Sequence, residues 1–594
     1  MSRVELRVLT SIPENPELRR DWNQLAQCME QPEVFYTYEW ALAVQRAYSE
    51  SLEPLILLCY EEGQLRGVAA LATDQHERAF FLASSTADYC DLVSQPEFRE
   101  SFLRLVLAEV GKRAIANLVL GNLPATSVSA SLIQAVAREN GYHVFIRPAY
   151  SCARVAIRPE HPAPDVKAVI AKKVRRKLLR LEREGAVCLI NLSSWEEVRV
   201  ALPQFQRAHV GRFLSTGRIS NQVTSQRRVF LEELAELLSE PGWMCLSELT
   251  VAGRAIAWNY GFRYEGSWFW YQPTFDTDFD HLSPGYCLLG KIVEQSCESD
   301  GINTVDLGLG DEEYKNRFSN SEQRTVNIDL SRHRVRHFAV RLRYASATAI
   351  KKFAPIEDAT RSAIDAATVV KSRIRHKGIG GLIVACGRRV WNRTFGTDEV
   401  RFYEYSSHSV PRVHEHARLV PIDLGLLSQA AMLYENDSET VQYLLRAASR
   451  LQSGGAQGFA LVERNGSPVH FCWLAPFEGF YMDELSSNLT EPAPGSVLVF
   501  DCWTPLSRRG CGYYGIAVQL LCSRARAAGN DAWIFSAATN VSSVRGLEKA
   551  GFHSRFSLVR TRFAGIPRIK QVAGANPAEK LGHGTLVKSA QFSK

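Results

Sequence analysis

The sequence predicts an α/β protein with several mixed β-sheets. Helical and strand-like hydrophobic patterns alternate along the chain, 46% of its residues are hydrophobic, and 22% are charged, as in ordinary folded proteins. Its 594 residues exceed one compact core and correspond to roughly four domains or large segments. We therefore expect a folded, multidomain chain.

The first domain is expected over residues 1–150. Two helical patterns come first, followed by two strands around the turn signal Glu-Glu-Gly-Gln, and then by strands that alternate with helices. This order predicts an α/β layer. The expected helices cover residues 16–30, 38–48, 102–112 and 127–140, and the expected strands cover residues 54–60, 65–73, 78–84, 117–123 and 143–148.

The second domain, residues 151–332, repeats the order of helices, a strand meander, and a returning helix and strand. Such a repeat predicts that the two domains are diverged tandem copies of one fold. The expected helices cover residues 167–185, 195–213 and 229–238 and begin again at Pro284; the expected strands cover residues 186–192, 243–253, 254–263, 267–276 and 325–331, the last closing this domain's sheet.

A basic segment follows. Residues 331–397 contain 15 Lys and Arg and three Asp and Glu, so this segment carries +12 and the rest of the chain −5. Local basicity does not indicate a general nucleic-acid binder; it predicts a helical linker over residues 333–400 that contacts an anionic membrane. The apolar run 378–387 is too short to cross a bilayer, and the first residues lack a signal-peptide core. We expect a cytoplasmic protein with peripheral contact at the inner membrane.

A third α/β domain is expected over residues 401–565, with a flexible tail over residues 566–594. The thirteen cysteines form no C-x-x-C pair and mostly lie in apolar patterns, so they are expected to be reduced core residues. No His/Cys cluster indicates a metal site.

The most informative segment runs from Asp276 to Lys315. Pro284 and Gly285 open a helix whose first N–H groups suit an anion, and Asp306 and Lys315 follow where they can converge on the same cleft. Three aspartates just before the turn would repel a pyrophosphate, which favours an amine or polyhydroxyl acceptor here. A solvated acidic turn is the alternative.

A glycine-rich loop in the third domain also precedes a helix. Arg508 and Arg509 add positive charge, and Gly510 and Gly512 allow the backbone to approach a pyrophosphate at the helix N-terminus. The alternative is a strand-helix turn without a ligand.

The segment around Pro284 and Asp306 resembles the CelD-like, or BioF2-like, acetyltransferases of the GNAT superfamily, over residues 34–330. The third-domain loop is similar to the GNAT acyl-CoA loop, Q/R-x-x-G-x-G/A, at Arg509 and Gly512, with Tyr514 where a small residue is usual. Residues 540–552 are similar to the second GNAT signature, with Leu547 at a place where many relatives have tyrosine. The resemblance implies tandem GNAT-like domains with mixed sheets, followed by a C-terminal GNAT domain.

The resemblance also implies functional residues. His209, which shares a helix face with Arg212, is the implied base near the groove of Asp306 and Lys315, and Asp88 and Asp91 match a further family pattern. Acetyl-CoA or another acyl-CoA is the implied co-substrate, without a metal. Its expected binding residues are Arg508, Arg509, Gly510, Gly512, Tyr513 and Asn540.

These observations predict an acyltransferase that moves an acyl group from acyl-CoA to an amine or hydroxyl of a cell-envelope or polysaccharide precursor. Two alternatives stay open. One is a FemAB-like transferase that uses aminoacyl-tRNA, for which the seven Lys and Arg between Lys172 and Arg183 offer a cationic helix face. The other is a GNAT-derived binding or regulatory protein without turnover. Apart from tRNA, no nucleic-acid partner is expected.

Overall fold

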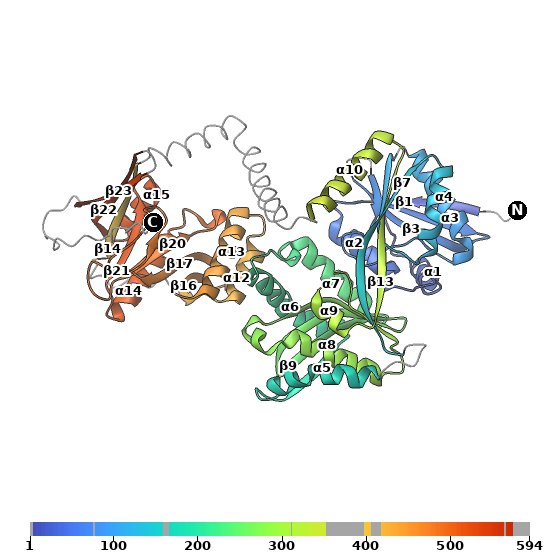
Figure 1. The fold of residues 1–594 in the computed structure, drawn as a ribbon, viewed down its shortest axis with the longest axis horizontal. Helices are drawn as coiled ribbons and strands as arrows, with labels where there is room; N and C mark the ends of the chain where they lie inside the picture. Colours follow the sequence, from blue (N-terminus) through green and yellow to red (C-terminus); the bar gives the residue numbers. More distant parts are fainter. Residues whose placement is uncertain are drawn as a thin grey trace. The chain divides into compact units, whose positions relative to one another are not determined.

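The computed structural model describes residues 4–74, 78–113, 115–158, 165–310, 312–351, 397–405, 417–563 and 566–573. The fold is α/β, with mixed sheets flanked by helices (Figure 1). The chain divides into two compact units. The N-terminal unit comprises residues 1–212 and 221–352, and the C-terminal unit comprises residues 213–220 and 353–594.

The N-terminal unit has two halves that share one sheet. The first half contains β1 (Val4–Leu9), α1 (Pro16–Gln27), α2 (Tyr38–Tyr48), β2 (Glu53–Glu61), β3 (Gln64–Thr73), β4 (Arg78–Phe81), β5 (Val93–Ser94), α3 (Arg99–Lys112), β6 (Asn117–Pro124), α4 (Val128–Glu139) and β7 (His143–Ala156). The second half contains α5 (Val166–Leu181), β8 (Val187–Leu192), α6 (Trp195–Ser215), α7 (Ser225–Ser239), β9 (Met244–Val251), β10 (Arg254–Tyr264), β11 (Ser267–Phe275), α8 (Pro284–Glu298), β12 (Thr304–Asp306), α9 (Glu313–Phe318), β13 (Ser321–Ser331) and α10 (Arg334–Lys351).

The strand order of this sheet is β1-β2-β3-β4-β6-β13-β7-β12-β11-β10-β9-β8, with β5 paired to β3. The two long strands β7 and β13 run between the halves (Figure 1). Residues 325–331, expected to close the second half's sheet, instead lie in β13 between β6 and β7 of the first half. The last strand of the second half thus completes the first, and the expected domain boundary at residue 150 falls inside β7.

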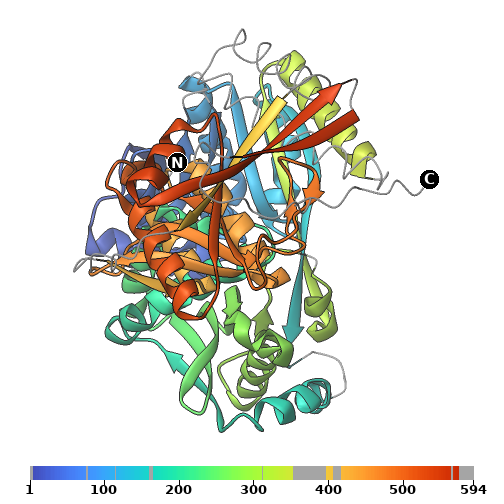
Figure 2. The ribbon, with the colours of Figure 1, turned by 90° about the vertical axis from the view of Figure 1, so that its left-hand side faces the viewer.

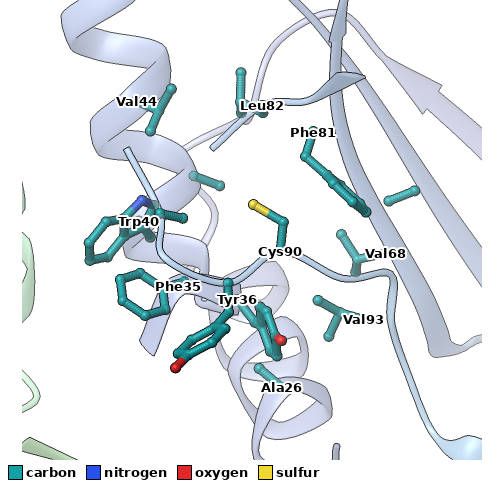
Figure 3. Packing of buried hydrophobic residues seen from close by; sticks show 14 of the residues in the cluster. Ala26, Phe35, Tyr36, Trp40, Val44, Val68, Phe81, Leu82, Cys90 and Val93 are labelled. Carbon is teal, nitrogen blue, oxygen red and sulfur yellow. The ribbon is translucent and has the colours of Figure 1, made fainter. Parts of the chain in front are cut away.

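A buried aromatic core joins the two halves. The Phe35 ring centroid lies 5.9 Å from that of Tyr89 and 5.5 Å from that of Phe269 in the second half. Trp40, which is fully buried, packs in the same way on Phe262 at 5.4 Å. Figure 3 shows Phe35, Tyr36 and Trp40 around the segment that carries Cys90. This packing holds the segment after β4, and with it Asp88 and Tyr89, against the second half.

The C-terminal unit contains β14 (Thr397–Tyr405), β15 (Ala417–Pro421), α12 (Leu424–Leu433), α13 (Ser438–Ser453), β16 (Gln457–Glu463), β17 (Pro468–Pro476), β18 (Tyr481–Met482), β19 (Ser487–Asn488), β20 (Val497–Trp503), α14 (Tyr513–Ala527), β21 (Ala532–Ala537), α15 (Val541–Lys549), β22 (Phe552–Phe563) and β23 (Ile566–Ala573). Its main sheet has the order β15-β16-β17-β20-β21-β14-β22-β23, and β18 and β19 form a separate hairpin. β23 pairs with β22, so ordered structure extends into the segment expected to be a tail.

One supersecondary unit occurs three times. Among the described strands, the parallel pairs are β4 with β6, β11 with β12, and β20 with β21, and each pair is connected through a helix: α3, α8 and α14. In each of the three pairs the parallel register covers three residues. The start of the connecting helix is therefore the comparable position in all three copies.

The expected linker begins with ordered structure, because α10 packs on β7 and β13 (Figures 1 and 2). Residues 352–396, which include the apolar run 378–387, lie outside the described residues. No helix in the described parts of the chain has both the length and the hydropathy of a membrane span.

Candidate active site

Asp306, at the end of β12, is the centre of a buried hydrogen-bonded cluster. Its Oδ2 accepts hydrogen bonds from the Tyr89 hydroxyl at 2.9 Å and from Arg154 Nε at 2.7 Å, and its Oδ1 accepts one from the Gly308 amide at 2.8 Å. Only 1% of Asp306 is exposed. With both oxygens engaged, Asp306 anchors the strand end and orients its neighbours.

Arg154 connects this carboxylate to a second one. The Arg154 guanidinium also donates to Glu33 at 3.0 Å and lies 5.2 Å from the centre of the Tyr89 ring. Burial raises the pKa of Glu33 to about 8, with Asp306 adding to the rise and Arg154 opposing it. One arginine therefore faces two carboxyl groups, and burial raises the pKa of one of them, Glu33.

Asp88 lies against the turn that follows β12. A Cβ atom at Gly308, which has φ +70°, would lie 2.6 Å from Asp88 Oδ2. Burial, and then the nearby charge of Asp306, raise the pKa of Asp88 to about 7, against the opposing charges of Lys315 and Arg227. A carboxyl group with a pKa near 7 is suited to accept a proton at physiological pH.

Lys315 approaches the same turn from α9. Its Nζ donates to the Leu309 carbonyl at 2.6 Å and pairs with Glu312 at 2.9 Å, and only 4% of the residue is exposed. The structure therefore brings Asp306 and Lys315 to one turn, together with Asp88.

His209 lies on α6 and is buried. Burial, and then the charges of Arg212 and Arg227, lower the pKa of His209 to about 3, so its imidazole is neutral at pH 7. Arg227 donates to the Tyr271 hydroxyl at 2.7 Å, and that hydroxyl donates to the Thr86 carbonyl. The charge of Arg227 therefore acts on both His209 and Asp88, and it lowers the pKa of each.

Sequence reasoning did not select Glu33, Arg154 or Arg227. A signal for Arg154 was present, because it is a lone arginine in the apolar strand segment Cys-Ala-Arg-Val-Ala. The other two gave no such signal, since each lies in a stretch where an exposed charge is ordinary.

Asp91 has a different environment from Asp88. It accepts hydrogen bonds from Ser127 and from Arg99, at 3.4 Å, and Arg99 is fully buried at the start of α3. In the first copy of the repeated unit, protein side chains thus fill the start of the connecting helix.

The start of α8 is partly filled in the second copy. Lys177 donates to the Ser283 hydroxyl at 2.8 Å, and a Cβ atom at Gly285 would lie 3.3 Å from the Phe275 ring. Of the three preceding aspartates, Asp276 is paired with Arg254 at 2.6 Å and accepts a hydrogen bond from the Asp278 amide at 3.1 Å. That aspartate is therefore a structural cap.

The start of α14 is open. Gly510 and Gly512 have φ values of +85° and +81°, and no atom lies within 4 Å of a Cβ placed on either. Arg509 Nε donates to the Thr504 carbonyl at 3.1 Å, while Arg508 lies 3.7 Å from Glu463, which also accepts from the Tyr513 hydroxyl. Among the described residues nothing bonds to the backbone amides of Gly510 and Gly512, so the loop presents them beside two arginines.

Tyr514 does not stand over this loop. Its hydroxyl lies 3.0 Å from Ser543 Oγ on α15, and its ring fills the space beside Gly546, where an added Cβ would lie 2.9 Å from the ring. Asn540 caps α15 by accepting from the Ser543 amide at 3.2 Å, and Leu547 is fully buried. No group of three or more His, Cys, Asp or Glu in the described residues is arranged to hold a metal ion.

Part of this chain is similar to known proteins. A search of curated proteins found no significant match. Among solved structures, FemX is 9% identical with a TM-score of 0.39, covering 52% of this chain and 95% of its own. A tandem GNAT protein from the clavulanic acid biosynthesis pathway is 11% identical with a TM-score of 0.32, covering 55% and 98%. L-PGS from Bacillus licheniformis is 11% identical with a TM-score of 0.34, covering 49% and 91%.

The sequence match is more specific. Residues 170–316 match the model of the acetyltransferase (GNAT) domain, and this range includes α8, β12, Asp306 and Lys315. The second half of the N-terminal unit is thus similar to a GNAT acetyltransferase domain.

Proposed function

We propose that this protein is a GNAT-type acyltransferase that moves an acyl group from acyl-CoA to an amine or hydroxyl of a cell-envelope or polysaccharide precursor. The observation that carries the proposal is the placement of Asp88 beside the Gly308 turn, next to Asp306 and Lys315, at the edge of the matched GNAT domain. A partly exposed carboxyl group with a pKa near 7, beside a buried lysine, is a suitable site for proton transfer.

In this proposal Asp88 accepts the proton of the acceptor amine or hydroxyl as that group attacks the thioester carbonyl. A new bond forms between the acceptor and the acyl carbon, the bond to sulfur breaks, and the CoA thiolate leaves with the electron pair and is then protonated. Lys315 steadies the developing oxyanion, and Asp306 holds Tyr89, Arg154 and the Gly308 amide in place. His209, which is neutral at pH 7, acts as a hydrogen-bonding group near Arg227.

We also propose that the C-terminal unit, considered by itself, binds acyl-CoA at the start of α14. The open amides at Gly510 and Gly512, together with Arg508 and Arg509, suit a pyrophosphate, and Tyr513 and Asn540 border the two helix starts. In the N-terminal unit, by contrast, side chains lie at the helix starts: Arg99 pairs with Asp91 at α3, and Lys177 donates to Ser283 at α8.

The test uses the full-length protein with acetyl-CoA labelled on the acetyl group and an extract of amine- and hydroxyl-bearing envelope precursors. We expect equal amounts of label transfer and free CoA thiol, insensitive to RNase, and loss of both in Asp88→Asn. The matched variant Asn140→Asp, a change of the same size at a helix end remote from the cluster, should retain transfer. CoA binding without label transfer would instead identify a binding protein.

A second candidate, transfer from aminoacyl-tRNA, is favoured by one observation. The side chains of Lys172, Arg175, Arg176 and Arg180 on α5, and of Arg183 just after it, are exposed, and within the described residues they form no ion pair or side-chain hydrogen bond. An unpaired cationic helix face suits a phosphate backbone. Label transfer from charged tRNA that RNase abolishes, and that Arg175→Gln with Arg180→Gln weakens, would support this candidate.

A further inference from the structure

Helix α10 is held on the N-terminal unit by one face. His337 and Tyr344 lie on Phe145 of β7, with ring centroids 6.5 and 5.7 Å apart, and the guanidinium of Arg147 lies 5.7 Å from the centre of the Tyr344 ring. These contacts place the side of α10 that carries His337 and Tyr344 against the sheet.

The outward side carries large apolar residues. Val335 is 84% exposed, Phe338 67% and Leu342 56%, and their spacing of three and four residues places them in one stripe. At about 100° per residue this stripe lies opposite His337 and Tyr344. A phenylalanine and two aliphatic residues in one exposed row form a continuous apolar patch, whereas scattered single apolar residues are ordinary on a protein surface.

Arginines flank the stripe on both sides. At about 100° per residue, Arg334 and Arg341 fall on one flank and Arg336 and Arg343 on the other. Within the described residues none of the four forms an ion pair or a side-chain hydrogen bond, and residues 332–356 contain no Asp or Glu. The surface is therefore apolar along its middle and uniformly positive along its edges.

We propose that the outer face of α10, defined by Val335, Phe338, Leu342 and the four flanking arginines, docks the protein on an anionic lipid surface. The stripe enters the boundary between headgroups and acyl chains, and the arginines contact the anionic headgroups. Charge complementarity favours an anionic lipid surface as the partner. The face carries four arginines and no acidic residue of its own helix, so its partner must offer negative charge next to an apolar region. The inference does not depend on the proposed acyl transfer.

The test is co-sedimentation of the full-length protein with phosphatidylcholine vesicles, with and without phosphatidylglycerol, at low and high salt. We expect binding to the anionic vesicles only, weakened by salt. Changing Arg334, Arg336, Arg341 and Arg343 to Gln should lower the partition coefficient at least about 100-fold, since each cation near the surface contributes roughly a fivefold factor. Val335→Ser, Phe338→Ser and Leu342→Ser together should lower it at least about tenfold.

Two control variants match these changes elsewhere in the same unit. Arg199→Gln with Arg207→Gln removes two exposed cations from α6, and Val200→Ser removes a 74% exposed aliphatic residue from the same helix; both should bind as the unaltered protein does. Equal binding to neutral and anionic vesicles would overturn the proposal. Unaltered vesicle binding by the α10 variants would also overturn it. If these variants lost thermal stability and kept vesicle binding, the stripe would be covered by another part of the protein, and the proposal would again be wrong.

Discussion

Helices α8 and α14 begin at equivalent points of two sheets, but their first turns differ. At α8, Lys177 binds Ser283 and Phe275 lies close to Gly285. At α14, Gly510 and Gly512 adopt positive φ angles in open space. The same crossover of strand, helix and parallel strand is therefore partly filled in one copy and has open space for an anion in the other.

The buried charged cluster, by contrast, lies beside α8, in the N-terminal unit. Next to α8, the strand β12 ends at Asp306, which lies among Tyr89, Arg154 and the Gly308 amide. The equivalent strand β21 ends at Ala537. We infer that features for proton transfer collect in the N-terminal unit and features for pyrophosphate binding in the C-terminal unit. The following predictions test this contrast.

The largest effect is expected at the open helix start. Gly512→Trp places a bulky side chain at φ +81° where the pyrophosphate would approach, so CoA affinity should fall at least about 100-fold. Calorimetry on the full-length protein measures it. Gly529→Trp is the control, because Gly529 has φ +84°, has open space, and follows the other end of α14. Equal losses in both variants would show that strain, not pyrophosphate contact, is responsible.

The next effect is expected at Asp88. Asp88→Asn removes the proton acceptor, so kcat should fall about 100-fold while CoA affinity stays the same. Because burial raises the Asp88 pKa to about 7, the rate of the unaltered protein should rise about tenfold per pH unit below that value and level off above it. A pH-rate profile of Asp88→Asn that keeps this rise would assign it to another group.

The same carboxyl group should make stability depend on pH. Its folded pKa of about 7 exceeds its ordinary value of 3.8, so between these values the unfolded chain binds fewer protons and stability falls as pH rises. Asp88→Asn should reduce that fall, measured by urea denaturation at pH 5 and pH 8. A fall that is unchanged in the variant would contradict the raised pKa.

A smaller effect is expected at Lys315 and His209. Each alanine variant should lower kcat about tenfold and leave CoA affinity unchanged, because the charge of Lys315 acts on Asp88 and both Asp88 and His209 lie close enough to Arg227 for its charge to act on them. Lys291→Ala is the control, since Lys291 pairs with Glu294 on the surface of α8. Full turnover in both variants would place the chemistry outside the N-terminal unit.

The smallest effect is expected at Gly308. Gly308→Ala combines a φ of +70° with a close contact to Asp88, whereas Gly253→Ala has a φ of +80° and open space. The first change should therefore reduce the free energy of unfolding by about 1 kcal/mol more than the second. Thermal or urea denaturation of both variants measures the difference, and equal losses would mean that Asp88 moves away without cost.

The chain's local patterns predicted many of its elements, including the helices at α1, α2, α5 and α8 and the strands of both meanders. They also directed attention to Asp306 and Lys315, because a helix start, a short strand and a charged segment follow one another there. Asp88 entered only through a family resemblance. Its contact with the Gly308 turn joins residues more than 200 positions apart, which periodicity does not encode.

By itself, the sequence determined the α/β class, the repeated order of elements and the basic character of residues 331–397, because each depends on hydrophobic period, turn residues or charge. Only the tertiary structure decided that β13 enters the first half between β6 and β7, that α10 turns Phe338 outward, and that Asp88 meets Gly308. These outcomes depend on which distant surfaces bury each other best, a competition among long-range contacts that no local segment specifies.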